Sequence, residues 1–222
     1  MNQTYTPKFQ EEYCAKIPAL TLLTSLGWTF LSPKQIMDYR GYKQDEVVLR
    51  PVLREELSKR SFMAGGKTCQ LSEKALDNLI SQVCSPALNE GLLKANERMY
   101  NHLLYGIAVT EFVDGKKVNP TIALIDWEHP ENNQFHFTEE FTVLRSGVVE
   151  TRRPDIVCFV NGIPLAVIEA KSPAGHGKKG PTIDEGISQS IRNQFNDEIP
   201  QLFAYSQLLL SINGHDGRYG TC

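Results

Sequence analysis

The chain lacks several features that would assign a protein to a class at once. None of its apolar runs approaches the roughly 20 residues that a membrane-spanning helix needs, and its polar start, Met1–Tyr5, does not resemble a signal peptide. Its five cysteines are odd in number and widely scattered, and no two of them form a Cys-x-x-Cys pair. These absences predict a cytoplasmic protein with reduced thiols and no membrane partner, and they argue against a zinc site.

Positive charge is also scarce, because 23 Lys and Arg residues against 26 Asp and Glu residues give a net charge of −3. A protein that binds DNA by itself usually has a basic face and a high isoelectric point. Here the basic residues are spread along the chain, with local clusters only at Arg152-Arg153 and Lys178-Lys179. The composition therefore predicts weak DNA binding by this chain alone, although it is compatible with an acidic metal site.

Residues 153–171 carry the most informative pattern in the chain. Two apolar, strand-like runs, 155–160 and 165–170, flank the dipeptide Asn161-Gly162. Asn-Gly between two apolar runs is a strong local signal for a tight β-hairpin. We therefore expect two antiparallel strands whose outer ends meet.

Three ionisable residues interrupt this apolar pattern at its outer ends: Asp155, Glu169 and Lys171. Two carboxylates and an ammonium group at one edge of a buried sheet are suited to binding Mg²⁺ and activating a water molecule. The bare spacing is also compatible with a simple ion pair at a strand end, between Glu169 or Asp155 and Lys171 or Arg153. The spacing alone leaves both interpretations open.

The register of the hairpin tests whether the three charges share a face. A two-residue loop at Asn161-Gly162 would turn Asp155 to the face opposite Glu169, because side chains alternate along a strand. A three-residue loop, Asn161–Ile163, would place both carboxylates on one face. We therefore expect a three-residue loop, or a β-bulge that has the same effect.

Several other candidate residues favour structural interpretations. Glu11 and Glu12 fit a solvated helix face better than a metal site. Asp126 fits a turn acid better than a group supporting the site, and no histidine has metal-ligand spacing. The segment Ser61–Thr68 misses a phosphate-binding P-loop at its first glycine and follows a predicted helix, so a helix-ending loop is favoured. Gly175–Gly180 matches G-x-G-x-x-G but is followed by Pro181, which favours a loop whose lysines are solvated or touch DNA.

The chain reads as helices, then strands, then helices, which predicts an α/β fold with a mixed sheet flanked by helices. Its 222 residues are enough for one domain, with a helical part over about 1–100 and a core over about 101–212. Apolar periodicity predicts helices at 8–26 (interrupted at Pro18), 33–40, 45–60, 72–86, 184–196 and 199–212. It predicts strands at 135–144, 155–160 and 165–171, and a hairpin around Asp114-Gly115.

The sequence around the three charged residues resembles that of a known family. Arg153-Pro-Asp-Ile-Val-x-Phe-Val-Asn-Gly-Ile-Pro-Leu-x-Val-Ile-Glu-x-Lys171 is similar, almost residue for residue, to the N-terminal nuclease region of type I restriction enzyme R subunits. The resemblance covers most of the chain and is densest from 124 to 220. It includes Thr6–Glu12, Leu26–Trp28, Leu124–Trp127, Glu131–His136, Glu140–Val143, Ser188–Gln194 and Ile199–Leu210.

The resemblance implies a PD-(D/E)xK nuclease with a restriction-endonuclease-like fold. Asp155, Glu169 and the Ala170 carbonyl would bind Mg²⁺, for which Mn²⁺ can substitute. Lys171 would position or deprotonate the attacking water, or offset charge on the phosphate. The alternative is a PD-(D/E)xK module that has lost catalysis and binds DNA or another subunit, but the intact Asp, Glu and Lys set argues against it.

The helix after the Glu-x-Lys strand carries a further implied catalytic residue. R subunits have a Gln-x-x-x-Tyr element there, and Gln189 matches its glutamine, whereas Asn193 stands where tyrosine is often found. This departure puts the role of the fourth position in doubt. Arg192 on the same helix fits a phosphate contact and a surface salt bridge equally well.

The resemblance also implies partners for this chain. They are double-stranded DNA and the methyltransferase and specificity subunits of a restriction complex, with sequence recognition carried out by another subunit. ATP is implied only for the full-length subunit, because no complete phosphate-binding loop is present in these residues.

Overall fold

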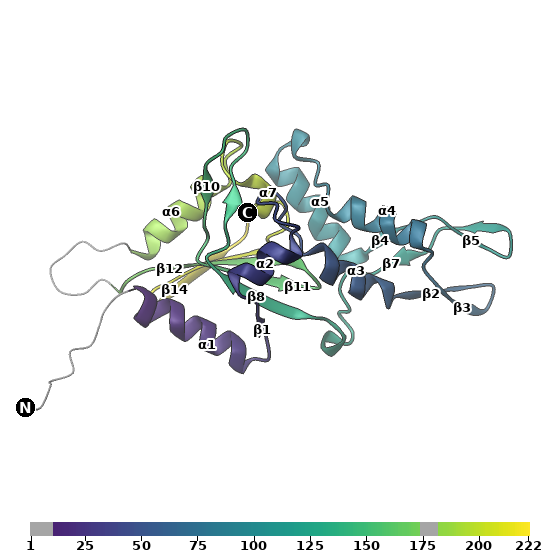
Figure 1. Cartoon of the computed structure of the whole chain (residues 1–222), viewed down its shortest axis with the longest axis horizontal. Helices are drawn as coiled ribbons and strands as arrows, with labels where there is room; N and C mark the ends of the chain where they lie inside the picture. The colour runs from purple at the N-terminus through teal and green to yellow at the C-terminus, as the bar shows by residue number, and fades with distance from the viewer. Residues whose placement is uncertain (1–10, 174–181) are drawn as a thin grey trace, which may run out of the picture.

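The computed structural model describes residues 11–173 and 182–222 and is built around a mixed six-stranded sheet (Figure 1). The strand order is β1-β8-β11-β12-β13-β14. Pairs β1/β8 and β12/β13 are parallel, and the other three pairs are antiparallel. The strands are β1 (Thr29–Phe30), β8 (Phe135–Glu139), β11 (Ile156–Val160), β12 (Ile163–Ala170), β13 (Leu208–Ile212) and β14 (Gly217–Gly220). The predicted mixture of helix and mixed sheet is confirmed.

Helices cover both faces of the sheet, so the central strands are buried. All five residues of β11 are buried, which explains its uninterrupted apolar sequence. On one face, Leu20 and Leu23 of α1 (Ile17–Ser25) pack against a small core that includes Phe137 and Ile156. A larger core on the other face includes side chains from α3 (Arg50–Ser58), α4 (Glu73–Val83), α5 (Leu92–Tyr105) and α7 (Pro200–Phe203).

The N-terminal helix shows the interruption expected at Pro18. Its first described turns form a π-helix, η1 (Glu12–Lys16), and α1 begins at Ile17. The amide of Ile17 donates to the Glu12 carbonyl, five residues back, and Pro18 has no amide hydrogen to continue the regular ladder. The helix therefore changes hydrogen-bond pattern directly before the proline.

The expected helices at 33–40 and 72–86 correspond to α2 (Pro33–Tyr39) and α4, which begin after the N-cap serines Ser32 and Ser72. The helix expected at 45–60 begins only at Arg50, and Pro51 occupies its first turn, where proline is tolerated. Helix α5 has no counterpart among the predicted helices. Two short 3₁₀ segments are η2 (Leu88–Glu90) and η3 (Pro130–Asn132).

The helix predicted over 199–212 was wrong in its second half. Helix α7 ends at Phe203, and residues 208–212 form β13, which pairs in parallel with β12. The connection between these parallel strands contains α6 (Ile183–Asn193) and α7. The apolar run Leu208–Leu210 fits either a helix or a strand, and pairing with buried β12 decides for the strand.

The strand predicted over 135–144 is divided at Glu140, whose backbone is left-handed with a φ of 54°. Strand β8 ends before it, and β9 (Val143–Leu144) leaves the main sheet to pair with β10 (Thr151–Arg152). The strand therefore contributes to two sheets.

Among the described residues, two hairpins with two-residue turns lie outside the six-stranded sheet. The predicted hairpin at Asp114-Gly115 is confirmed, with β5 (Glu111–Val113) and β6 (Lys116–Val118) as its strands. The segment Ser61–Thr68 is also a hairpin, with Gly65-Gly66 as the turn, and is not the helix-ending loop we expected. Gly175–Gly180 lies outside the described residues. The remaining strands are β2 (Ser61–Ala64), β3 (Lys67–Gln70), β4 (Ile107–Ala108) and β7 (Thr121–Ile122).

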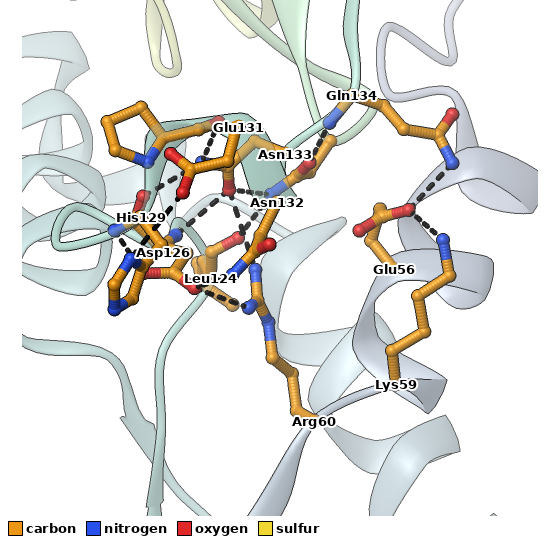
Figure 2. Close-up of polar contacts among 12 residues, drawn as sticks. Glu56, Lys59, Arg60, Leu124, Asp126, His129, Glu131, Asn132, Asn133 and Gln134 are labelled. Atoms are coloured by element: carbon orange, nitrogen blue, oxygen red, sulfur yellow. Dashed lines mark hydrogen bonds and ion pairs between the residues drawn. The ribbon is translucent and has the colours of Figure 1, made fainter.

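The turn of the β11–β12 hairpin is held by a buried polar network. Asn161 is fully buried and donates from Nδ2 to the Leu124 carbonyl and to Asn133 Oδ1, at 2.9 and 2.8 Å. Its Oδ1 accepts from the Gln134 amide at 2.8 Å. Asn133 in turn donates to the Asp126 carbonyl, and Figure 2 shows it between Asp126 and Gln134. The network fixes the hairpin turn against residues 124–134.

Asp126 belongs to this network as a turn acid, as the sequence predicted. Its carboxylate accepts from the His129 amide and from Asn132 Nδ2, both at 2.9 Å (Figure 2). The Arg60 guanidinium lies 3.6 Å from it. Hydrogen bonding from Asn132 and His129 lowers the pKa of this carboxyl below its ordinary value.

No helix in residues 11–173 and 182–222 combines the length and the apolar character required to cross a membrane.

Replacement of Gly162 by alanine is expected to destabilise the fold far more than the same change at Gly115. Both glycines occupy the second position of a two-residue turn, with φ values of 81° and 75°. A Cβ on Gly162 would lie 2.6 Å from the Leu49 carbonyl oxygen, whereas one on Gly115 would meet nothing within 4 Å. We expect a loss of about 1 kcal/mol for Gly115→Ala and about 3 kcal/mol for Gly162→Ala, measured by urea unfolding. Equal losses would contradict the close packing of the turn.

ATP is expected neither to bind this chain nor to change its properties. A phosphate-binding loop must connect a strand to a helix so that backbone amides face the phosphate, and Ser61–Thr68 instead joins two antiparallel strands. Calorimetric titration of ATP with Mg²⁺ should give no saturable heat. Stoichiometric binding that Lys67→Ala abolishes would show that this hairpin binds nucleotide.

Candidate active site

The β11–β12 hairpin combines a two-residue turn with a β-bulge. Near the turn Val160 faces Ile163, whereas farther out Cys158 faces Ala166, and the register shifts between Cys158 and Phe159. Leu165 is therefore the extra residue on β12. The three-residue loop was wrong, and the expected alternative, a bulge that restores the register, is confirmed.

Pro164 supplies a physical reason for the bulge. It stands in β12 opposite Phe159, directly before the extra residue Leu165. A proline has no amide hydrogen to donate to the ladder, so prolines inside sheets are confined to edges and bulges. The sequence signal was thus present in Ile163-Pro164-Leu165, although the hairpin analysis did not use it.

The corrected register brings Asp155 beside the end of β12. Ile156 faces Ile168, and the Ala170 amide donates to Asp155 Oδ2 at 2.8 Å. The backbone of Asp155 is held from the other side, because its carbonyl accepts from the Glu140 amide at 2.9 Å. The side chain that precedes β11 is therefore fixed at the mouth of the hairpin.

Lys171 joins the two carboxylates at this point. Its Nζ lies 3.5 Å from Asp155 Oδ2 and 3.6 Å from Glu169 Oε2, and it donates to the Ala170 carbonyl at 2.8 Å. Its own amide donates to the Ile212 carbonyl of β13 at 2.7 Å. The structure therefore brings Asp155, Glu169, Lys171 and the Ala170 carbonyl together.

The ion pair that the spacing also allowed is present as well, because Lys171 lies within ion-pair distance of both Asp155 and Glu169. Arg153 takes no part in it and instead pairs with Glu140. What sets this cluster apart from an ordinary surface pair is its burial, since Glu169 is fully buried and Lys171 is 7% exposed.

Glu169 is the most electrostatically unfavourable group in the cluster. Neither of its carboxylate oxygens accepts a hydrogen bond in the part of the chain that the structure describes. Burial, followed by the neighbouring charge of Asp155, raises the pKa of Glu169 to about 9, and Lys171 offsets this only in part. A carboxylate left in this state has oxygen lone pairs available for a further cation.

The donor set here consists of two carboxylates and a backbone carbonyl. Within residues 11–173 and 182–222, no group of three or more His, Cys, Asp or Glu side chains is arranged to hold a metal ion. Oxygen ligands of this kind, completed by water, suit a hard cation such as Mg²⁺, which is usually bound through one or two carboxylates. The residues present therefore fit Mg²⁺ and offer no soft ligand for zinc.

A cleft of about 530 Å³ opens beside the cluster, between the end of β12, the N-terminal helix and α6. Gln189 of α6 lines it, as expected for a residue of the site. Asn193 does not line this cleft and is buried at 1% exposure. Its lining residues are Glu11, Lys171, Glu185, Ser188, Gln189 and Arg192.

Glu11 reaches this cleft, so the solvated helix face that the sequence favoured was wrong for it, whereas Glu12 is exposed as expected. Burial raises the pKa of Glu11, the positive charge of Lys171 opposes the shift, and the charge of Asp155 adds to it. Lys16 ties the helix in place through ion pairs to Glu139, at 3.0 Å, and to Glu140. These contacts join residues more than 100 positions apart, and no local sequence pattern marks them.

No histidine of the described residues lines the cleft. His129 lies in the exposed turn with Asp126, and His215 lies in an exposed turn before β14. Burial lowers the pKa of His102 and of His136. His176 lies outside the described residues.

The stability of the metal-free protein is expected to fall as the pH rises above 5. The pKa of Glu169 is raised from 4.5 to about 9, so between these values the folded protein retains a proton that the unfolded chain releases. This difference lowers the free energy of unfolding by up to about 1.4 kcal/mol for each pH unit. Glu169→Gln removes the titration, so the variant should gain stability over the wild type as the pH rises from about 5 to about 8. The measurement is urea unfolding in EDTA.

Glu198→Gln provides a control of opposite sign. The hydrogen bond from Arg152 lowers the pKa of Glu198, so its stabilising effect is present near neutral pH and is lost as the pH falls. This variant should be less stable than the wild type at about pH 8, and the difference should shrink towards pH 4. A difference between wild type and Glu169→Gln that does not change with pH would contradict the raised pKa of Glu169.

Comparison with known proteins places the chain in a family. The family model described as type I restriction enzyme R protein N terminus matches residues 8–222. The type I restriction enzyme HindI endonuclease subunit of Haemophilus influenzae is 30% identical over 211 residues, which are 92% of this chain and 19% of that protein.

A second relative comes from Methanocaldococcus jannaschii and is provisionally named the type I restriction enzyme MjaIXP endonuclease subunit. It is 27% identical over 228 residues, covering 96% of this chain and 20% of that protein. The chain thus spans about a fifth of the length of these two relatives. The match along nearly its whole length shows that the chain belongs to the family of type I restriction enzyme R protein N termini.

Proposed function

We propose that this chain is a Mg²⁺-dependent endonuclease domain that hydrolyses DNA phosphodiester bonds within a type I restriction enzyme R subunit. The observation that carries the proposal is the convergence of Asp155, Glu169 and Lys171 at the mouth of one hairpin, beside an open cleft. The names of the relatives, which are endonuclease subunits, support the same reaction class. The mixed sheet with helices on both faces supports a restriction-endonuclease-like fold of the PD-(D/E)xK type.

Asp155, Glu169 and the Ala170 carbonyl are the groups that would hold Mg²⁺, or Mn²⁺ in its place. The unsatisfied oxygens of Glu169 support this assignment, because a buried carboxylate without a hydrogen bond is costly unless a cation compensates it. When bound, the ion would polarise the phosphate and lower the pKa of a bound water.

The protein's own groups would perform the remaining tasks. Asp155 is oriented by the Ala170 amide, so one of its oxygens is fixed while the other stays available. Lys171 is close enough to both carboxylates to shield their charge from an approaching phosphate, and its Nζ carries protons for a water or a phosphate oxygen. Gln189, facing the same cleft, has an amide that would orient the water or the phosphate.

The matched part is about a fifth of the length of the two relatives, and the resemblance to R subunits supports a wider setting for the reaction. We propose that the remaining part of the R subunit uses ATP to move DNA, that methyltransferase and specificity subunits join it in a restriction complex, and that another subunit selects the DNA sequence. The five cysteines are odd in number and widely scattered, and no two of them form a Cys-x-x-Cys pair, which supports a cytoplasmic location for the complex.

Replacement of Lys171 or of Glu169 is expected to abolish cleavage without unfolding the protein. Lys171→Ala and Glu169→Gln should lower the rate of nicking of supercoiled plasmid by a factor on the order of 10³ or more, because they remove charge stabilisation of the transition state. Wild-type cleavage should be slow, independent of DNA sequence, supported by Mg²⁺ or Mn²⁺ and absent in EDTA.

Lys67→Ala is the matched control, because it removes one lysine charge from the exposed β2–β3 hairpin. It should leave the nicking rate unchanged. A folded Lys171→Ala protein that cleaves at the wild-type rate would refute the assignment. A wild-type protein that binds DNA and never cleaves it with either metal would instead favour the catalytically inactive binding module.

A further inference from the structure

Arg192 differs from most arginines of this protein because no carboxylate of the described residues lies within ion-pair distance of it, although its charge is near enough to Glu198 to help lower the pKa of that carboxyl. In residues 11–173 and 182–222, no carboxylate lies within 4.0 Å of its guanidinium. Of the other arginines in these residues, Arg218 and Arg40 also have no ion pair. Arg40 differs from Arg192 because its side chain is buried and its guanidinium donates to three backbone carbonyls. The arginines in ion pairs are Arg50, Arg54, Arg60, Arg98, Arg145, Arg152 and Arg153.

Arg192 is one of the residues that line the cleft. It lies in the last turn of α6, three residues after Gln189, and both residues line the cleft together with Lys171. The one hydrogen bond that its guanidinium makes in the described chain runs from Nη2 to Asn193 Oδ1 at 3.3 Å. Because a guanidinium has five N–H donors, most of them remain available to a ligand.

The position of Arg192 in the last turn of α6 also has a purely structural explanation. A positive side chain in the last turn interacts favourably with the helix dipole, typically by a few tenths of a kcal/mol at an exposed site. That effect does not depend on which face of the helix the residue occupies. It therefore does not account for the placement of Arg192 on the face that lines the cleft.

The electrostatics of the cleft show what Arg192 would do there. Glu11 and Glu185 line the cleft, and Asp155 and Glu169 lie beside it, so a DNA phosphate would meet predominantly negative charge. Lys171 is buried between the two carboxylates of the cluster. Among the residues that line this cleft, Arg192 is the cation that is not already paired with a carboxylate.

We propose that Arg192 binds a backbone phosphate of the DNA next to the bond that is cleaved, and so positions the strand in the cleft. This inference rests on the proposed nuclease function. An arginine fork matches two phosphate oxygens at once, which lysine cannot do. Contacts to phosphate carry no sequence information, so Arg192 contributes affinity and orientation irrespective of the bases.

The test is the equilibrium binding of a fluorescent duplex by this chain in Ca²⁺ over a range of salt concentrations. Arg192→Gln should weaken binding by roughly 5- to 10-fold at low salt and reduce the slope of log affinity against log salt by about 0.9, the value expected for one lost phosphate contact. Arg192→Lys should retain the slope and lose part of the affinity. Arg218→Gln removes the same charge from a groove on the other side of α6 and should change neither.

Cleavage kinetics provide a second readout. Arg192→Gln should raise KM while retaining most of kcat, whereas Lys171→Ala should lose kcat. An Arg192→Gln protein whose salt slope and KM equal those of the wild type would overturn the inference while leaving the proposed function standing. A wild-type protein without salt-dependent DNA binding would overturn the proposed function, and this inference with it.

Discussion

The arrangement of this protein depends on keeping one carboxylate, Glu169, out of water without a hydrogen bond. Ionising a carboxyl group in such surroundings costs several kcal/mol, a large part of what a domain has in reserve, which is why the metal-free protein retains a proton there. The fold limits this cost with one lysine beside the carboxylate, and it holds the second carboxylate, Asp155, by a backbone amide. The apolar packing of β11 and β12 stabilises the fold and so offsets the unfavourable free energy of this site. The site is thus stabilised by its surroundings more than by its own contacts.

The surroundings of the cluster come from three separate parts of the chain. The central hairpin provides the charged groups, the N-terminal helix provides Glu11, and α6 provides Gln189. Two of these parts are held by interactions of their own: the hairpin turn by the buried network around Asn161, and the N-terminal helix by the ion pairs of Lys16. The side chains that make these contacts do not line the cleft, so the side chains that do line it can change without loss of the framework.

Local sequence patterns predicted the parts of the fold that depend on neighbouring residues. The hairpin at Asn161-Gly162, helices α2 and α4, and the need for a bulge that brings Asp155 to the face of Glu169 follow from turn chemistry, apolar periodicity and side-chain alternation, although the three-residue loop was wrong. Features decided by distant contacts were not predictable in this way. Residues 208–212 form a strand because β12 lies beside them, and Glu11 lines the cleft because Lys16 pairs with residues more than 100 positions away. Pro164 is an intermediate case, since its missing amide marked the bulge locally.

The bulge at Leu165 imposes a counting rule on the hairpin. Loss or gain of a single residue between Asp155 and Glu169 would turn one carboxylate to the other face, whereas changes of two residues, or one on each strand, would restore the arrangement. A deletion of an even number of residues in this segment should therefore keep both carboxylates on one face, whereas a deletion of an odd number should separate them. The same rule makes Leu165 a poor residue to remove from a shortened or redesigned hairpin, although its side chain is only partly buried and carries no charge.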